Sequence, residues 1–246
     1  MSATINTATA APKRILMVAA NPAVSTTLGW PVGFWASELI HPWVTFTATG
    51  YSVTLASPKG GRIELDGYSD PRDASGYSAD DLLSLGFLAS PTHAALLADT
   101  RRVADCRVED YDAVVVCGGQ SPMFTFPTEP ALHALLAGFY TAGKVTAALC
   151  HGVAALLYVK LADGTPLIRG RTITGFANSE EDLADAMVGQ KVMPFRIEDA
   201  AKKLGVNFIT APAWREFAFR DGRLVTGQQQ YSGAAVARLV IEALGV

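Results

Sequence analysis

VTAALCHGVAAL, residues 145–156, joins an apolar strand directly to an alanine- and leucine-rich helix. The run 145–149 predicts a buried strand and the segment 152–161 predicts a helix. Cys150 and His151 stand at the junction. A sharp strand-to-helix turn exposes a nucleophile at the top of a sheet, as in the better-known Gly-x-Ser-x-Gly version of this turn. The stretch therefore predicts an α/β fold with a nucleophilic cysteine at position 150.

The same junction predicts the ionisation of Cys150. The start of a helix favours negative charge through its free amides and its dipole, so we expect a thiolate there. Gly152 leaves room for close backbone approach at the turn. The alternative is that Cys150 is a small core residue, as free cysteines usually are. We interpret Cys106 and Cys117 in that way.

Strands and helices alternate outward from this stretch. Strands are predicted at 15–20, 51–56, 113–117, 145–149 and 172–176, and helices at 33–50, 129–142, 152–161, 197–204 and 231–244. Asp221-Gly222 predicts a hairpin turn between 217–219 and 224–226. This alternation predicts a mostly parallel central sheet with helices on both faces.

The order of elements predicts one α/β domain over residues 13–246, preceded by a flexible leader over 1–12. Segment 66–104 is polar and helical only in patches, which predicts a small insertion or lid. Ligands of parallel sheets bind beyond the carboxyl ends of the strands. This rule predicts that the segments directly after Val116, Leu149 and Phe176 form the ligand-binding site.

Three further groups are candidates for the site. Gly118-Gly119 can bend the backbone tightly. Their amides, together with the amides of Gln120 and of the residue after Cys150, could then point toward an oxyanion. Glu38 lies among apolar neighbours that favour its protonated form, although a solvated helix position is the simpler interpretation. The acidic run 178–182 either orients His151 or begins a helix.

Composition excludes several classes of function. Half of the residues are hydrophobic and 17% are charged, which is typical of a compact globular protein. The net charge of -3 gives no reason to expect nucleic acid as a partner. Three cysteines without close spacing predict neither a disulfide framework nor a zinc site, and they fit the cytoplasm. No secretory signal is evident, and no apolar run approaches the roughly 20 residues of a membrane helix.

Taken in order, several motifs resemble one family. They are GFWASELIHP at 33–42, ASPKGG at 56–61, CGG at 117–119, ALCHG at 148–152, ITGF at 173–176 and DGRLVTG at 221–227. This set resembles the ThiJ/PfpI superfamily, within the class I glutamine-amidotransferase-like fold. It is most similar to the branch of heat-shock chaperones and glutathione-independent glyoxalases (glyoxalase III).

The resemblance implies a flavodoxin-like sandwich, a homodimer, and a Cys–His–acid site that uses no metal or other cofactor. It assigns the nucleophile to Cys150 and its neighbour to His151, and it places the Glu38 carboxyl close to the sulfur. Glu181 matches the third, acidic member, with Glu180 as the fallback. The chain departs from the branch at Gln120, where histidine is usual, and at Gln228–Tyr231, where Asn-Pro is usual.

The function expected from the resemblance is the conversion of a small 2-oxoaldehyde, such as methylglyoxal, to a 2-hydroxy acid. Cys150 would form a hemithioacetal, and neither glutathione nor a metal would be needed. The same groups could cleave an amide through an acyl-enzyme. A third hypothesis is a chaperone or a redox sensor in which the sulfur is oxidised. A true glutamine amidotransferase is disfavoured because no synthetase domain is evident.

Overall fold

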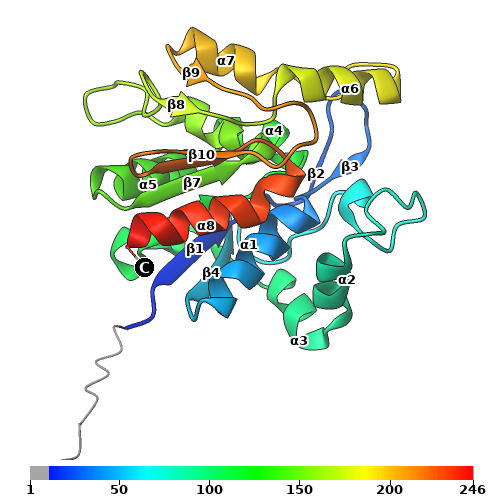
Figure 1. The fold of residues 1–246 in the computed structure, drawn as a ribbon, viewed down its shortest axis with the longest axis horizontal. Helices are drawn as coiled ribbons and strands as arrows, with labels where there is room; N and C mark the ends of the chain where they lie inside the picture. The colour runs from blue at the N-terminus through cyan, green and yellow to red at the C-terminus, as the bar shows by residue number, and fades with distance from the viewer. Residues whose placement is uncertain (1–10, 246) are drawn as a thin grey trace, which may run out of the picture.

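The computed structural model describes residues 11–245 (Figure 1). Most of the predicted leader, residues 1–10, lies outside the described residues, as does Val246. The strands are β1 (Arg14–Val18), β2 (Ala23–Val24), β3 (Pro31–Val32), β4 (Ser52–Ser57), β5 (Arg101–Arg102), β6 (Ala113–Val116), β7 (Val145–Leu149), β8 (Thr172–Ile173), β9 (Asn207–Phe208), β10 (Ala218–Asp221) and β11 (Leu224–Gly227).

The helices are of two kinds. The α-helices are α1 (Ala36–Ala48), α2 (Leu82–Ala89), α3 (Pro91–Ala94), α4 (Ser121–Thr125), α5 (Pro130–Thr141), α6 (Asn178–Val188), α7 (Ile197–Lys203) and α8 (Gly233–Leu244). The 3-10 helices are η1 (Gly67–Ser69), η2 (Ala95–Leu97), η3 (Val103–Asp105), η4 (Val108–Asp110), η5 (Phe126–Thr128), η6 (Cys150–Tyr158) and η7 (Gln230–Ser232).

In the described chain the main sheet has seven strands, in the order β10-β11-β7-β6-β1-β4-β5. Its neighbouring strands are parallel, apart from the antiparallel hairpin of β10 and β11. The chain adds β4 and β5 on one side of β1 and then crosses over to add β6 and β7 on the other. Ligands of such sheets bind where the strand order reverses. The topology therefore places a site at the carboxyl ends of β1, β6 and β7.

The side chains of β1 alternate between two hydrophobic layers. Leu16 and Val18 face a core shared with α5, η6 and α7, whereas Ile15 and Met17 face a core shared with α1 and α8. All four side chains are fully buried, and each such burial contributes about 1.5–3 kcal/mol. The predicted mostly parallel sheet with helices on both faces is thereby confirmed (Figure 1).

The predicted helix 33–50 differs from α1 in two ways. It begins at Ala36, because Phe34 is held in an extended bridge to Leu65. Pro42 lies inside the helix and does not end it. The proline packs closely on the start of α8, where a Cβ added to Gly233 would lie 3.0 Å from its Cδ. Tertiary packing of α1 on α8 therefore outweighs the helix-breaking tendency of proline.

The prediction of a fifth strand in the main sheet at 172–176 is wrong. Only Thr172–Ile173 is extended, and this short β8 pairs with β9 in a separate two-stranded sheet. The place beside β7 is taken by β11 instead. The predicted hairpin at Asp221-Gly222 is confirmed as β10 and β11. The helix predicted at 152–161 begins two residues earlier, as the 3-10 helix η6.

The segment predicted as an insertion, 66–104, has two parts. Its helices α2 and α3 pack beside α1, where Phe87 meets Trp43 edge-on at 5.2 Å. In its first part, before α2, Tyr68 and Tyr77 line a pocket at the carboxyl edge of the sheet. The segment therefore supplies part of a pocket wall. No helix among residues 11–245 has the length and apolar character that crossing a membrane requires.

Candidate active site

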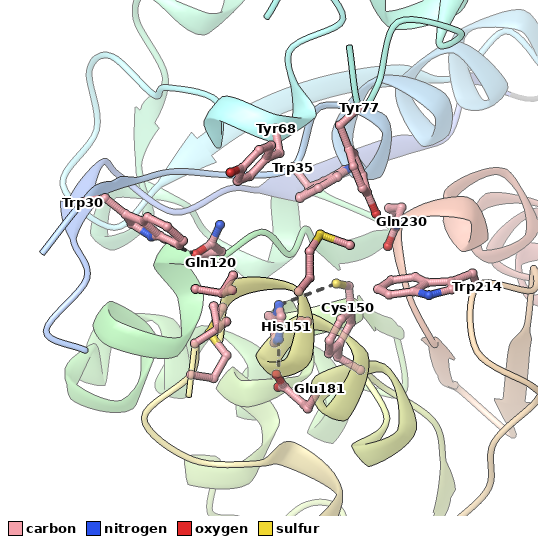
Figure 2. A pocket seen from close by; sticks show the side chains of 16 residues that line it. Trp30, Trp35, Tyr68, Tyr77, Gln120, Cys150, His151, Glu181, Trp214 and Gln230 are labelled. Carbon is pink, nitrogen blue, oxygen red and sulfur yellow. Dashed lines mark hydrogen bonds and ion pairs between the residues drawn. The ribbon is translucent and has the colours of Figure 1, made fainter. Parts of the chain in front are cut away.

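Cys150 lies where β7 ends and η6 begins, in a strained backbone conformation. Its φ of 53° is in the left-handed region, which costs a residue with a side chain about 1–2 kcal/mol. The side chain is only 3% exposed, yet it lines the pocket at the carboxyl edge of the sheet (Figure 2). Strain of this kind persists only where the surrounding structure enforces it. The turn thus presents the sulfur to the pocket, as predicted.

Two glycines allow the neighbouring chains to enforce this turn. A Cβ added to Gly152 would lie 2.6 Å from the carbonyl oxygen of Cys117. A Cβ added to Gly118 would lie 2.3 Å from Oε2 of Glu38 and 2.9 Å from Cβ of Cys150. Side chains at these positions would overlap their neighbours. The end of β6, the start of η6 and the first turn of α1 can therefore meet only because both residues are glycine.

Glu38, in the first turn of α1, is fully buried beside the sulfur. Burial raises the pKa of Glu38 from 4.5 to about 8, while the Cys150 thiol and the Gly118 amide partly oppose the shift. Among the described residues, neither carboxyl oxygen has a partner at normal hydrogen-bond geometry. The carboxyl is therefore protonated at neutral pH. It is free to donate a hydrogen bond to the sulfur or to a bound molecule.

His151 connects the sulfur to a second carboxyl. Its Nδ1 lies 3.8 Å from Sγ of Cys150, and its Nε2 lies 3.1 Å from Oε1 of Glu181. When Nε2–H donates to the Glu181 carboxylate, the lone pair of Nδ1 faces the thiol, and this pattern assigns the tautomer. The ring also packs against Phe176, with centroids 4.2 Å apart. The three groups form a continuous Cys–His–Glu chain (Figure 2).

The expectation of an ionised sulfur in the resting site is not supported. Burial is the largest cause that raises the pKa of the Cys150 thiol. The amide of His151 lowers this pKa, as expected for the start of a helix, but it is outweighed. Burial of the sulfur therefore favours the neutral thiol.

Glu180 and Glu181 are neighbours in the first turn of α6 and have different partners. Glu181 reaches His151, as the preferred assignment expected. Glu180, the fallback, accepts hydrogen bonds from the amides of Ala177 and Trp214 and from Nε2 of Gln228. Glu180 therefore braces the segments around the pocket, while Glu181 belongs to the Cys–His–Glu chain. The run 178–182 both orients the imidazole and begins a helix.

The loop after β6 is anchored by a carboxyl that the sequence did not single out. Asp66 is fully buried and accepts hydrogen bonds from the amides of Gly33 (2.9 Å) and Gln120. Burial raises the pKa of Asp66 to about 6, although these two amides lower it. Since the Gln120 amide is engaged, it does not face an oxyanion in this structure, and the expected part of Gln120 in the site stays a prediction. Gln120 meets the pocket through its side chain, which accepts from Nε1 of Trp30 at 3.2 Å.

The oxyanion role of Gly118 and Gly119 stays a prediction. Gly118 faces Glu38, as described above. Gly119 has a φ of 110° and is packed so closely on the chain at 33–35 that an added Cβ would lie 2.5 Å from the amide nitrogen of Trp35. Its backbone therefore requires glycine on two grounds, conformation and space.

Most of the pocket wall was missed by the sequence analysis. Besides the predicted site residues it comprises Trp30, Trp35, Tyr68, Tyr77, Phe176, Ala184, Met187, Val188, Val192, Met193, Trp214 and Gln230. These residues come from segments that are far apart in the sequence. One sequence pattern could have indicated part of this wall. Residues 181, 184, 187 and 188 are spaced so that they lie on a single face of α6. Nothing distinguished the loop aromatics from ordinary core residues.

The described residues offer no alternative site for a metal or a disulfide. Within 11–245 no group of three or more His, Cys, Asp or Glu side chains is arranged to hold a metal ion. Cys106, Cys117 and Cys150 are all free and buried.

Comparison with known proteins agrees with this geometry. Residues 30–243 match the DJ-1/PfpI family. The chain belongs to the DJ-1/PfpI family. The resemblance inferred from the ordered motifs is thereby confirmed. The family match spans the turn at Cys150 and the segments that supply Glu38 and Glu181.

The relatives include enzymes and solved structures. The glutathione-independent glyoxalase HSP31 of Saccharomyces cerevisiae is 30% identical over 243 residues, which cover 95% of this chain and 99% of the relative. The crystal structure of glyoxalase III from Candida albicans matches with a TM-score of 0.79 and 28% identity, covering 94% of this chain and 97% of that one. The 24 kDa rapid encystment protein of Francisella tularensis matches with a TM-score of 0.85 and 28% identity, covering 95% and 100%.

Replacement of Gly118 tests the close packing around the sulfur. We expect Gly118→Ala to lower the free energy of unfolding by about 1–3 kcal/mol, because the added methyl group overlaps Glu38 and Cys150. The matched control is Gly86→Ala in α2, where an added Cβ meets nothing within 4 Å. This control should gain about 1 kcal/mol from helix propensity. Urea denaturation measures both, and equal stability of the two variants would contradict the packing argument.

Replacement of Glu38 tests its protonation. The folded protein keeps a proton on Glu38 that the unfolded chain releases above pH 4.5, so wild-type stability falls as the pH rises from about 4.5 to about 8. Glu38→Gln removes this dependence. The stability of the variant relative to wild type should therefore rise across that window, by on the order of a few kcal/mol.

Urea denaturation at pH 5 and pH 8 measures the effect of Glu38→Gln. The control is Glu64→Gln, at a carboxyl whose side chain is half exposed. Its stability relative to wild type should differ little between the two pH values. If Glu38→Gln behaves like this control, Glu38 is ionised in the folded protein.

Proposed function

We propose that this protein is a glutathione-independent glyoxalase that converts a small 2-oxoaldehyde, such as methylglyoxal, to the corresponding 2-hydroxy acid. One observation carries the proposal: the buried thiol of Cys150 has a protonated carboxyl on one side and an imidazole on the other. That arrangement supplies a nucleophile, an acid and a base next to one another, with the sulfur and the imidazole in the pocket wall. The curated relatives named as glutathione-independent glyoxalases support the same assignment.

The reaction begins with attack of the Cys150 sulfur on the aldehyde carbon. The thiol proton passes to Nδ1 of His151 and from there to the aldehyde oxygen, which gives a neutral hemithioacetal. Glu181 orients the imidazole and stabilises its charged form through the bond to Nε2. Attack coupled to this proton transfer avoids a free thiolate, which burial of the sulfur disfavours.

The second stage moves a proton from one carbon to the next. His151 removes the proton from the former aldehyde carbon while Glu38 protonates the ketone oxygen, and an enediol forms. The imidazolium then protonates the neighbouring carbon, and the hydroxyl on the sulfur-bearing carbon returns its proton to Glu38. The product is a thioester of a 2-hydroxy acid. Water hydrolyses it and restores the Cys150 thiol, so the reaction consumes one water and needs no external oxidant or reductant.

The geometry favours a small carbonyl compound over a peptide or other large amide. A Cys–His–Glu chain is also suited to acyl transfer. However, Cys150 is only 3% exposed and His151 only 5%, at the base of a pocket walled by aromatic side chains. An extended peptide would have to bring its backbone carbonyl to that depth. Moreover, Glu38 as a protonated acid beside the sulfur serves enediol formation, for which amide cleavage has no need.

Replacement of Cys150 tests the nucleophile. We expect Cys150→Ala to abolish lactate formation from methylglyoxal in the absence of glutathione, because no other group can form the hemithioacetal. The matched control is Cys106→Ala, at a buried cysteine that does not line the pocket. It should retain wild-type turnover. Enzymatic determination of lactate measures both variants, and turnover by Cys150→Ala would exclude the proposed mechanism.

Replacement of Glu181 tests the orientation of the imidazole. Glu181→Gln keeps the shape but favours the tautomer in which Nδ1 carries the proton, and it no longer stabilises the imidazolium. We expect kcat to fall by about 10²–10⁴-fold, as is typical when the carboxylate of a catalytic triad is replaced by an amide. The control is Asp182→Asn, on the same helix with the side chain 67% exposed. Similar kcat values for the two variants would remove Glu181 from the mechanism.

Two further properties complete the proposal. The three free cysteines fit a reducing compartment, so we place the protein in the cytoplasm. We also propose that it forms a homodimer. Light scattering of the purified protein tests the dimer independently of activity.

A further inference from the structure

The pocket above Cys150 is larger and more apolar than methylglyoxal requires. The centres of water molecules can occupy about 100 Å³ of it. Since one water needs roughly 10–15 Å³ of such volume, the pocket has room for about seven to ten waters, whereas methylglyoxal, with about five non-hydrogen atoms, replaces about five at most. The remaining space is bounded mainly by aromatic, methionine and valine side chains. The wall is therefore suited to an apolar group several times the size of a methyl.

Trp214 forms one side of that space in an unusual backbone conformation. Its φ is 60°, in the left-handed region that side chains disfavour. The conformation is held by its amide, which donates to Oε1 of Glu180 at 3.1 Å. The indole meets Phe176 edge-on, with centroids 5.9 Å apart, and Phe176 in turn packs on His151. A strained residue fixed in this way next to a catalytic group is a reason to look for a functional role.

Gln230 adds a free polar group to the same side of the pocket. It is only 5% exposed, and among the described residues its Nε2 has no partner at normal hydrogen-bond geometry, although the Tyr77 hydroxyl lies close to the same side chain. Its backbone carbonyl is fixed by the hydroxyl of Ser37, at 2.9 Å. Figure 2 shows Gln230 between Tyr77 and Trp214, close to Cys150. A buried donor without a partner costs free energy unless a ligand accepts from it, so Gln230 points to a carbonyl or hydroxyl oxygen of a bound molecule.

We propose that the preferred substrates are 2-oxoaldehydes whose ketone carries a large, flat apolar substituent, such as an aryl group. The substituent lies against Trp214 and Phe176, while Nε2 of Gln230 donates to the ketone oxygen. In this pose the aldehyde carbon stays at Cys150 and the ring fills the apolar space. This inference rests on the proposed glyoxalase function and adds the class of substrate to it.

The test compares kcat/KM for phenylglyoxal and methylglyoxal without glutathione, by measuring mandelate and lactate. We expect the phenylglyoxal to methylglyoxal ratio to be at least about 10 in the wild-type protein, since even one methylene in a complementary pocket discriminates about 10–200-fold. Trp214→Gly suits the left-handed backbone and removes the indole. It should lower the ratio by about 10-fold or more. Because the two aldehydes differ in intrinsic reactivity, this change in ratio is the decisive quantity.

Two variants on α6 provide a second, independent measurement. Met187 lines the pocket and is 71% exposed, so Met187→Ala will not disturb folding. It should lower the ratio in the same direction as Trp214→Gly. Leu183 lies one turn away, is 46% exposed and does not line the pocket. Leu183→Ala should leave the ratio unchanged.

The outcomes separate this inference from the function on which it rests. If wild type converts methylglyoxal through Cys150 but the ratio is one or less, or if neither pocket variant changes the ratio, the aryl preference is overturned and the glyoxalase function stands. If neither aldehyde is converted, the proposed function fails and this inference fails with it. A high ratio that falls in both pocket variants supports both.

Discussion

The left-handed turn at Cys150 is the constraint on which the rest of the site depends. It exists because β7 pairs with β6 on one side and with β11 on the other, and because η6 begins directly after β7 without an intervening loop. The chain can hold this conformation only where Gly118 and Gly152 let three backbone segments come into contact. Packing of the sheet and its flanking helices therefore stabilises a local geometry that would be unfavourable in an isolated peptide.

Burial beside this turn also fixes the protonation of Glu38. Glu38 lies in the interior without a cation or a well-formed hydrogen bond, so burial keeps its proton in place up to a pH of about 8. Glu181 lies one imidazole away from the sulfur and has His151 as its partner. A protonated carboxyl next to an imidazole can supply an acid and a base at one pH. Here both lie beside the same thiol.

The sequence predicted the parts of the site that depend on local structure. The strand–Cys–His–Gly order was sufficient for Cys150, because a turn between a strand and a helix is a property of neighbouring residues. Glu38 and Glu181 followed from the family resemblance rather than from spacing. The ionisation of Cys150 was expected from the start of the helix alone, because local sequence does not report the depth of burial, which raises the pKa of the thiol.

Features that depend on distant contacts were beyond sequence reasoning. The segment 172–176 has the composition of a strand, but β11 occupies its place in the sheet. Asp66 has the appearance of an ordinary loop aspartate, and only the fold brings the amides of Gly33 and Gln120 to it. Trp214 gave no signal either, since its backbone conformation is imposed by Glu180, 34 residues earlier in the chain.

Helix α6 both holds the imidazole of His151 and lines the pocket. Its first turn supplies the carboxylate that holds the imidazole, and its later turns supply part of the pocket wall. Sliding or tilting this helix to enlarge the pocket would also pull the carboxylate away from its partner. Changes of substrate range that involve α6 are therefore expected to come from individual side chains on a stationary helix rather than from movement of the helix.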